Sequence, residues 1–290
     1  MVISCLMGGL GNQLFQYAFG LRLAHDRQTD LKLSTTLLES RLMARLRNYT
    51  LRPYELDVFN LTIPCTSSFE TALALAKATS GASGSVFLRE TPNLTPNLPT
   101  LNPSAPLVFC WGYWQSEAWF KPVAPLLRQQ LRFRKPLSDA SQRYADAIAR
   151  ARTPVFLHVR RGDYVTNANA RQLHGFAGET YYRNAIERMR EQVEEPHFFV
   201  FSDELLWVKT TLGPLLNPAT YVEGNTGSDS WQDLALMSQC RHAIVANSSF
   251  SWWGAWLNPA ENRLVLAPRQ WFVSAAAQTK VVVPEQWTLL

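Results

Sequence analysis

Apolar runs and helix-spaced apolar positions alternate along the first part of the chain. Residues 2–6 form a short apolar run typical of a buried strand, and Leu14, Tyr17 and Leu21 recur at helical spacing within residues 13–26. The glycines at 8, 9 and 11 predict a tight turn between the two. The N-terminus is therefore predicted as strand, loop and helix, the opening unit of a Rossmann-like layer.

From residue 108 onward the chain repeats this alternation of strand and helix, as a parallel sheet requires. Strands are predicted over residues 108–111, 155–159, 197–201 and 243–246, and helices over 119–131, 139–151, 180–192, 231–240 and 252–257. Residues 66–106 shift to Ser, Thr, Ala, Asn and Pro, which predicts a surface excursion with a helix at 69–78. We place two α/β domains at residues 1–140 and 141–290.

Composition excludes several classes of protein. With 290 residues, 47% hydrophobic and 18% charged, the chain is expected to bury a large core rather than remain disordered. The net charge of +5 fits an anionic substrate or a loose attraction to an anionic membrane, and no basic stripe indicates nucleic-acid binding. No targeting or membrane-spanning segment is recognised, and four widely spaced cysteines predict reduced thiols, so we expect a cytoplasmic protein with at most peripheral contact with the inner face of the membrane.

A charged cluster follows the strand predicted at residues 155–159. Side chains alternate along a strand, so His158 and Arg160 point to one side while Val155, Leu157 and Val159 pack on the other. Ligands bind outside the carboxyl ends of parallel strands, and guanidinium groups match phosphate oxygens. The cluster predicts a diphosphate site that uses the pair of arginines; an ion pair between Arg161 and Asp163 is the structural alternative.

Two further strand ends are predicted at the same sheet edge. Asp203 follows the strand at 197–201, and Asn247, Ser248, Ser249 and Phe250 follow the strand at 243–246 and precede a helix. Ser and Asn are good N-caps, and a helix N-terminus attracts anions. A capped helix without a ligand is the alternative, but three strand ends converging on one crevice favour a binding site.

The N-terminal glycines and the aromatic residues each leave two interpretations open. The spacing in residues 7–12 lacks the pattern of a dinucleotide fingerprint, so these glycines allow either close approach of a ligand, with the Asn12 amide facing it, or only a structural turn. The 10 Trp, and the aromatic cluster at 111–114, either pack in cores or contact carbohydrate.

Four motifs together resemble one known family. Residues 7–18 (MGGLGNQLFQYA), 158–164 (HVRRGDY), 201–203 (FSD) and 247–254 (NSSFSWWG) are similar, in this order, to the motifs of the bacterial α-1,2-fucosyltransferases of glycosyltransferase family 11. The resemblance implies a GT-B fold, in which two Rossmann-like domains face each other across a cleft. It also implies inverting transfer of fucose from GDP-β-L-fucose to the 2-hydroxyl of a terminal galactose in a glycan, with no divalent metal or other cofactor.

The resemblance also implies roles for individual residues. Arg160 would hold the β-phosphate, Ser249 would bind phosphate, His158 and Asp233 would recognise the guanine side, and Asn12 would face the reaction centre. A carboxylate discriminates guanine because it accepts from both N1–H and the exocyclic amine. The wider donor site is expected to include Asp203, Asn247, Ser248 and Phe250.

The general base is not settled by the resemblance. Some relatives outside the α-1,2 group carry a Glu five residues after the motif Asp, where this chain has Ala168. Asp163, His174 and Glu179 are the nearby candidates, and we predict Asp163, with Arg pairing as its structural alternative. A dissociative reaction needs little help from a base.

Two other functions remain alternatives at this point. A non-catalytic carbohydrate-binding protein would explain the Trp content but would have no use for a diphosphate site. An O-fucosyltransferase, or another GT-B transferase with a different acceptor, would keep the donor site and change the acceptor site.

Overall fold

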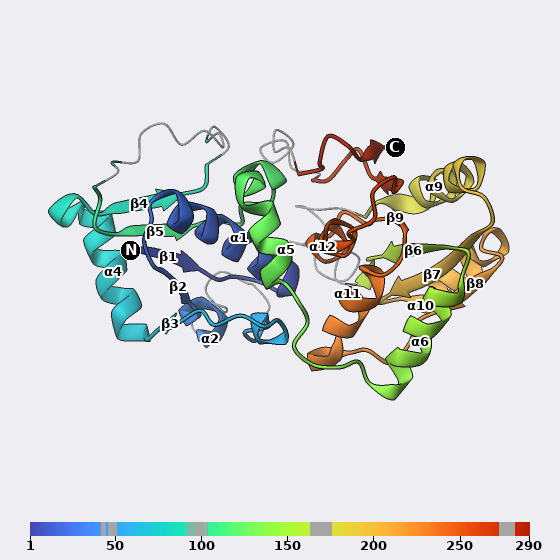
Figure 1. The fold of residues 1–290 in the computed structure, drawn as a ribbon, viewed down its shortest axis with the longest axis horizontal. Coiled ribbons are helices and arrows are strands. Elements are labelled where there is room, and N and C mark those ends of the chain that lie inside the picture. Colours follow the sequence, from blue (N-terminus) through green and yellow to red (C-terminus); the bar gives the residue numbers. More distant parts are fainter. Residues whose placement is uncertain are drawn as a thin grey trace. The chain divides into compact units, whose positions relative to one another are not determined.

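The computed structural model describes residues 1–41, 45, 51–91, 94, 102, 104–162, 176–272 and 282–290 of the chain. The chain divides into two compact units, Met1–Lys135 and Pro136–Leu290. The division falls after residue 135, close to the predicted boundary after residue 140. Each unit is built around its own parallel sheet (Figure 1).

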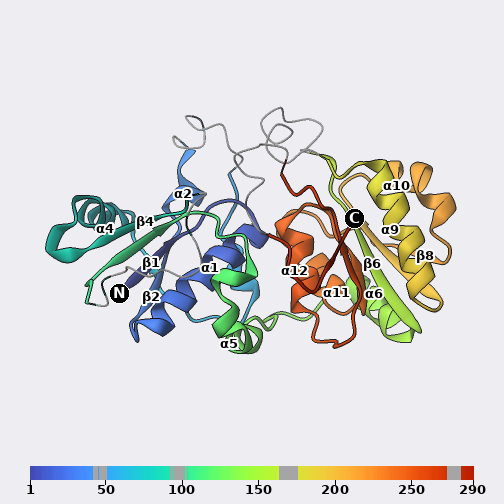
Figure 2. The ribbon, with the colours of Figure 1, turned by 90° about the horizontal axis from the view of Figure 1, so that it is seen from above.

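The N-terminal unit contains a five-stranded parallel sheet in the order β3-β2-β1-β5-β4. The strands are β1 (Val2–Cys5), β2 (Leu31–Ser34), β3 (Cys65–Thr66), β4 (Val86–Arg89) and β5 (Val108–Trp111). Helix α1 (Leu10–Asp26) covers one face and α4 (Ser68–Ser80) the other (Figure 2). Alternation along β1 explains this: the Ser4 hydroxyl donates to the Gln16 carbonyl of α1, whereas Ile3 and Cys5 pack in the core that includes α4.

Two predictions for this unit are wrong. Residues 66–106 are not a surface excursion, because β3, α4 and β4 supply two strands of the sheet and the helix that covers one face. The single helix predicted over 119–131 is broken into short 3-10 turns (Glu117–Trp119 and Lys121–Val123) and α5 (Ala124–Gln130). Pro122 and Pro125 cause the break, since proline lacks the N–H that a continuing helix needs.

The C-terminal unit contains a six-stranded parallel sheet in the order β11-β10-β9-β6-β7-β8. The strands are β6 (Thr153–Val159), β7 (Pro196–Ser202), β8 (Ala219–Tyr221), β9 (His242–Ile244), β10 (Val265–Ala267) and β11 (Thr288–Leu289). The chain builds outward from β6 to β8 and then returns to place β9 on the other side of β6. This reversal is a topological switch point, where open α/β sheets bind ligands.

Helices cover both faces of the second sheet (Figure 2). Alternate residues Val155, Leu157 and Val159 of β6 pack with Tyr182 and Ile186 of α9 (Gly178–Gln192), in the same core as α10 (Leu205–Thr211). His158 points to the other face, where its ring lies 6.1 Å from that of Phe250 in α12 (Ser249–Leu257). Helices α6 (Asp139–Arg150) and α11 (Trp231–Met237) pack with each other on this second face, and α11 also packs against α12.

The tryptophans of the motifs are core residues. Trp252, Trp253 and Trp256 of α12 and Trp114 after β5 are fully buried, which favours the packing interpretation over contact with carbohydrate. All four cysteines are free, and Cys5, Cys110 and Cys240 are buried. None of the described helices is both long enough and apolar enough to span a bilayer. The predicted α/β fold class with two Rossmann-like domains is confirmed.

Candidate functional site

The end of β6 places Arg160 beside the end of β7. Val159 and Ser202 are register partners, so the next residues, Arg160 and Asp203, lie side by side, and Nη1 of Arg160 is 3.2 Å from Oδ2 of Asp203. The Arg160 side chain keeps 29% of its surface exposed. A partly exposed guanidinium at a strand end, fixed in place by a carboxylate, is suited to bind an anionic ligand.

Asp203 also organises the turn that follows β6. Its Oδ1 accepts from the backbone N–H of Arg161 at 2.9 Å, and its Oδ2 accepts from that of Gly162 at 3.0 Å. A Cβ on Gly162 would lie only 2.9 Å from Oδ2 of Asp203, so a larger residue would displace the carboxylate. Asp203 therefore positions Arg160 and the turn, and its predicted place in the donor site stays a prediction.

Arg161 does not form the predicted pair of phosphate-binding arginines. Its guanidinium lies 5.0 Å from the ring of Trp207 and 5.7 Å from that of Phe176, and it forms an ion pair with Glu204. Trp207 and Phe176 pack against the core on the α9 face of the sheet. Alternation along the chain explains the difference: Arg160 follows His158 to one side of the sheet, and Arg161 goes to the other.

The N-terminus of α12 lies at the same switch point, because β9 pairs with β6. The hydroxyl of Ser248 caps the helix by accepting from the Phe250 N–H at 3.3 Å. Ser249 is half-exposed, and its hydroxyl has no hydrogen-bond partner among the described residues. The N–H groups of the first turn and the Ser249 hydroxyl together form an arrangement suited to an anionic group such as phosphate. The helix begins at Ser249, three residues before its predicted start.

Two further residues of the predicted donor site lie beneath this helix end. Asn247 is buried, and its side-chain amide donates to the Trp271 carbonyl at 3.4 Å. His158 is also buried, and its Nδ1 has no partner among the described residues. Burial, helped by the positive charge of Arg160, lowers the pKa of His158 to about 3. A neutral imidazole offers one donor and one acceptor, which suits an uncharged polar ligand group.

Asp233 stands in the first turn of α11. Its Oδ1 accepts from Nδ2 of Asn225 at 2.8 Å, and Asn225 in turn accepts from the Ser141 hydroxyl at 3.0 Å. Burial raises the pKa of Asp233 to about 7, against the lowering effect of the Asn225 amide. A half-buried carboxylate with one oxygen engaged keeps the second available for a ligand. Asn225 was not predicted, and nothing in its sequence context marks it.

Of the three candidates for a general base, only Glu179 lies among the described residues. Asp163 and His174 lie outside the described residues. Glu179 is paired with Arg183, whose Nε lies 2.6 Å from its Oε1. Glu179 is therefore engaged on the surface of α9, and Asp163 remains a prediction.

The N-terminal unit has a switch point of its own, between β1 and β5, and it is lined with amides. Asn12, in the first turn of α1, accepts through Oδ1 a hydrogen bond of 2.7 Å from Nε2 of Gln115, which follows β5. No described residue bonds the Asn12 Nδ2 or the Gln115 Oε1. The pair therefore presents amide N–H donors and a carbonyl acceptor, which complement the hydroxyls of a sugar.

The loop before α1 is held by buried glutamines. Gln13 donates to the carbonyls of Gly8 (2.9 Å) and Pro53 (2.8 Å) and accepts from the Glu55 N–H, while Gln16 accepts from the Met7 N–H. Gly8 adopts a φ of +75°, and a Cβ there would lie 2.6 Å from Nδ2 of Asn12. The glycine thus lets the loop approach Asn12 closely.

Gln115 is presented by a strained segment. Trp114 has a φ of +55°, a value that non-glycine residues rarely adopt, and its ring is stacked 3.9 Å from that of Phe19. Burial of Trp114 holds this conformation, so the neighbouring Gln115 is fixed against α1. Sequence reasoning missed Gln115, although its position just after a strand was a usable signal.

No group of three or more His, Cys, Asp or Glu side chains suited to a metal ion occurs among the described residues. The polar groups that have been placed are an arginine, a helix N-terminus, amides and single carboxylates. Such a donor set fits an anion and neutral hydroxyls better than a divalent cation.

The two Rossmann-like units, one with an arginine and a helix N-terminus at its switch point and one with amides there, have the fold of glycosyltransferases of the GT-B type. The model of Glycosyl transferase family 11 matches residues 101–289, and the chain belongs to this family. An alpha-1,2-colitosyltransferase of Escherichia coli is 31% identical over 99% of this chain and 98% of its own length. The O-antigen biosynthesis glycosyltransferase WbnK of the same species is 30% identical over 93% and 94%, respectively. The human galactoside alpha-(1,2)-fucosyltransferase 1 is 31% identical over 45% of this chain and 39% of its own length.

Solved structures of fucosyltransferases share the fold. NodZ from Bradyrhizobium superposes with a TM-score of 0.52 at 12% identity, covering 89% of this chain and 92% of its own. FUT1 of Arabidopsis thaliana, in complex with GDP, gives a TM-score of 0.53 at 11% identity, covering 91% and 70%. At such low identity the likeness concerns the fold alone.

Proposed function

We propose that the protein transfers L-fucose from GDP-β-L-fucose to the 2-hydroxyl of a terminal galactose in a glycan, with inversion and without a metal. The observation that carries the proposal is the switch point of the C-terminal unit, where Arg160 and the N-terminus of α12 follow the paired strands β6 and β9. The names of the family relatives, which include α-1,2-fucosyl and α-1,2-colitosyl transferases, support the linkage and the class of donor.

Arg160 and α12 stabilise the leaving group in this proposal. When the bond between the fucose C1 and the β-phosphate oxygen breaks, negative charge grows on the diphosphate and positive charge on the sugar ring. Arg160, the first N–H groups of α12 and the Ser249 hydroxyl are fixed before the reaction, so they stabilise that charge without reorganisation. Asp203 holds the Arg160 guanidinium in place.

The guanine base is assigned to His158 and Asp233. A neutral imidazole can bond a base edge without attracting phosphate, and the second Asp233 oxygen can accept from the guanine amine or N1–H. GDP binding would then favour the ionised form of Asp233, whose pKa is raised to about 7 in the free protein.

The acceptor galactose is assigned to the N-terminal unit. The amides of Asn12 and Gln115 orient the sugar hydroxyls, and a β-linked donor yields an α-linked product because the acceptor attacks C1 from the face opposite the diphosphate. Asp163 receives the proton of the attacking hydroxyl in this account. Asp163 contributes little to the rate in this account, because the bond to the leaving group is largely broken before the hydroxyl attacks and little base help is needed.

A second donor deserves a direct comparison, because the colitosyltransferase relative matches 99% of this chain. Colitose is L-fucose without its 3-hydroxyl, so a site built for one sugar differs from the other by a hydrogen-bonding group. A different acceptor, as in an O-fucosyltransferase, is the other alternative. We propose a cytoplasmic location, which the free and mostly buried cysteines support.

One experiment separates these functions. The purified protein is incubated with GDP-fucose or GDP-colitose and a panel of β-galactosides, and the product linkage is determined by NMR. The proposal predicts an α-1,2-linked fucosyl galactoside. Faster transfer from GDP-colitose would favour the second donor, and a product linked elsewhere, or none, would contradict the acceptor assignment.

A further inference from the structure

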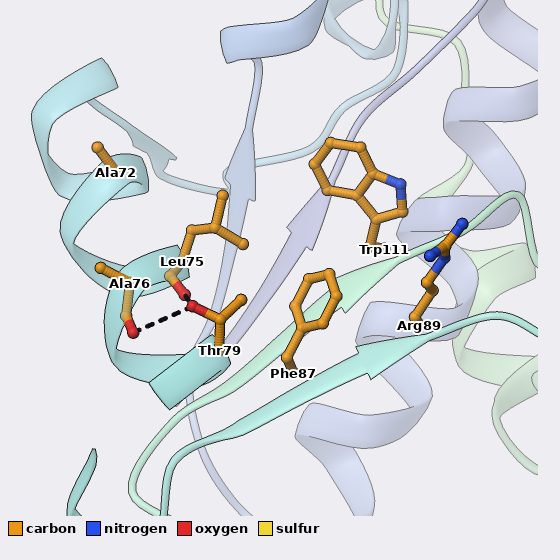
Figure 3. Close-up of a pocket in the computed structure, with 7 residues that line it drawn as sticks. All are labelled: Ala72, Leu75, Ala76, Thr79, Phe87, Arg89 and Trp111. Atoms are coloured by element: carbon orange, nitrogen blue, oxygen red, sulfur yellow. Dashed lines mark hydrogen bonds between the residues drawn. The ribbon is translucent and has the colours of Figure 1, made fainter. Parts of the chain in front are cut away.

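An apolar groove opens on the N-terminal unit, on the face of its sheet opposite α1. It has a volume of about 530 Å³, within the range of ligand-binding cavities. Figure 3 shows the side chains that line it, which come from α4, from the edge strand β4 and from β5: Ala72, Leu75, Ala76, Thr79, Phe87, Arg89 and Trp111. Trp111 is the last residue of β5, a strand that also borders the N-terminal switch point, and the other residues of the groove belong to neither switch point.

The walls of the groove are apolar even where a polar side chain occurs. The Thr79 hydroxyl donates back to its own helix, to the carbonyls of Leu75 (2.8 Å) and Ala76 (3.2 Å). Leu75, Phe87 and Trp111 remain half-exposed because β4 is the edge strand and α4 covers the sheet only in part. The groove therefore exposes apolar side chains that adjoin the core of the N-terminal unit, and it is suited to bind apolar groups.

An exposed apolar stripe on α4 adjoins the groove. Phe69 is 78% exposed and Leu73 is 47% exposed, and they stand one helical turn apart. Ala72 and Ala76, at the same helical spacing, connect them with the groove. Exposed large side chains beside an apolar cavity mark an interaction surface rather than isolated surface residues.

Positive charge accompanies this apolar surface. Arg89 stands at one end of the groove, and neither it nor the exposed Lys77 of α4 forms an ion pair with a described residue. The first 135 residues carry 14 Lys and Arg against 8 Asp and Glu, whereas the rest of the chain carries 14 against 15. The whole excess of positive charge therefore belongs to the N-terminal unit.

We propose that the face formed by α4 and β4 docks on the surface of an anionic lipid bilayer. Phe69 and Leu73 enter the boundary between headgroups and acyl chains, the groove receives part of an acyl chain, and Arg89 pairs with a lipid phosphate. Apolar side chains combined with basic charge are what an interfacial membrane site requires. A neutral apolar partner would have no use for the charge, and a soluble anion would have no use for the groove.

Co-sedimentation with vesicles tests the proposal. The full chain should bind vesicles of phosphatidylglycerol and phosphatidylcholine at low ionic strength, and bind pure phosphatidylcholine at least tenfold less. The double variant Phe69→Ser/Leu73→Ser and the variant Arg89→Glu should each lose about tenfold in partitioning. Transfer to a soluble galactoside should be unchanged in both, which shows that they are folded.

Matched controls come from the C-terminal unit. Leu206 of α10 is 76% exposed and Arg241 is also exposed, so Leu206→Ser and Arg241→Glu repeat the same chemical changes away from the groove. Both should bind vesicles as the wild type does. Equal losses in the controls, or absence of binding to anionic vesicles, would overturn the proposal.

Acyl chains brominated near the headgroup test entry into the groove. They should quench part of the tryptophan fluorescence, and Trp111→Phe should remove that part. Quenching unaffected by this change would contradict acyl entry. If light scattering instead shows a dimer that Phe69→Ser/Leu73→Ser dissolves, the surface pairs with a second copy of the chain and the membrane assignment is wrong.

Discussion

The two units share a topology and differ in the chemistry at their switch points. In the C-terminal unit the adjacent ends of β6 and β9 carry Arg160 and the N-terminus of α12, both of which favour negative charge. In the N-terminal unit the ends of β1 and β5 carry the amides of Asn12 and Gln115, which are neutral. The same sheet topology thus places groups that attract anions in one unit and groups that can bond neutral hydroxyls in the other.

Neighbouring residues within one motif show the same contrast. Arg160 and Arg161 are adjacent in sequence, yet Arg160 lies beside Asp203 at the strand end, whereas Arg161 packs against Trp207 and Phe176 and pairs with Glu204. One motif can therefore contain a residue that faces the candidate site and a residue that stabilises the fold. The alternation of side chains along the strand places the two on opposite sides of the sheet. The variants below are ordered by the size of their expected effect.

Arg160→Ala should cause the largest loss of activity. Removing a fixed cation from a leaving group that gains charge costs about 3–4 kcal/mol in the barrier, or roughly 10²–10³ in kcat. Arg160→Lys should recover little, because an ammonium cannot reproduce the planar fork. Steady-state kinetics with saturating donor measure both variants, and activity above about a tenth of the wild type in Arg160→Ala would refute the assignment.

Arg161→Ala is the matched control. It removes a guanidinium packed on two aromatic rings and an ion pair, so it should lower the melting temperature while the folded fraction keeps its affinity for GDP. A selective loss of GDP binding with unchanged stability would show that Arg161 contacts the donor.

Asn12→Ala and Gln115→Ala should weaken use of the acceptor by about tenfold in kcat/KM, since each removes one hydrogen-bonding group from the pair. Gln115→Ala leaves the Asn12 amide in place but frees it to rotate, so its loss should be the smaller of the two. Kinetics at varied acceptor and fixed donor give the comparison. A rise in the KM for GDP-fucose alone would instead assign this pair to the donor.

Asp233 should make GDP binding depend on pH. Burial raises its pKa to about 7, so the carboxyl is mostly protonated at pH 5.5 and mostly ionised at pH 8. If the ionised form accepts from guanine, the affinity of the wild type should rise over this range by up to about tenfold more than that of Asp233→Asn. Calorimetry measures the GDP affinity of both proteins at each pH. Ionisation of the GDP phosphate affects both equally, so it drops out of the comparison. Parallel pH profiles would leave Asp233 with a structural role.

Ionisation of Asp233 should lower the free energy of unfolding as the pH rises, whereas it should strengthen GDP binding. Because the pKa of Asp233 is higher in the folded protein than its usual value of 3.8, the folded state binds the proton more tightly. This contribution is fully present below pH 3.8 and is lost as the pH rises to about 7. Urea unfolding at several pH values should therefore show that Asp233→Asn gains stability relative to the wild type between pH 5 and 8.

The two serines at the start of α12 should behave differently. Ser248→Ala removes the helix cap and should cost about 1 kcal/mol of stability. Ser249→Ala should leave the melting temperature unchanged and weaken GDP binding several-fold, because its hydroxyl has no partner among the described residues. Thermal melts and GDP titrations of both variants test this, and the reverse pattern would mean that the two roles are exchanged.

The smallest expected effect is that of chelation. Excess EDTA should leave the transfer rate unchanged, because Arg160 and α12 are proposed to stabilise the diphosphate. A loss of activity that Mn²⁺ or Mg²⁺ restores would show that a metal shares this role.

The sequence predicts the C-terminal unit better than the N-terminal one, for a physical reason. Two of its strands, β6 and β7, are seven residues long and mostly apolar, and the alternation that places His158 and Val159 on opposite faces is local. The short strands β8, β10 and β11 of this unit were not predicted. Strands β3 and β4 are two and four residues long and lie in a polar context, so only pairing with distant strands defines them.

The candidate site shows the same limit. Arg160, Asp203 and Ser249 could be placed because each follows a strand, and strand ends share one edge of a parallel sheet. Gln115 was missed because its contact with Asn12 joins residues 103 positions apart in the chain. Asn225 lies only eight residues before its partner Asp233, but it belongs to no motif that marks it. Arg161 was misassigned because a motif does not state which of its side chains are enclosed.

Calorimetric titration of GDP into Arg160→Ala and Asn12→Ala, beside the wild type, tests the division of roles between the two units most directly. The account predicts that Arg160→Ala weakens GDP binding at least tenfold, while Asn12→Ala binds GDP within about twofold of the wild type. Equal losses in both variants, or a loss confined to Asn12→Ala, would contradict the assignment of the anion site to the C-terminal unit.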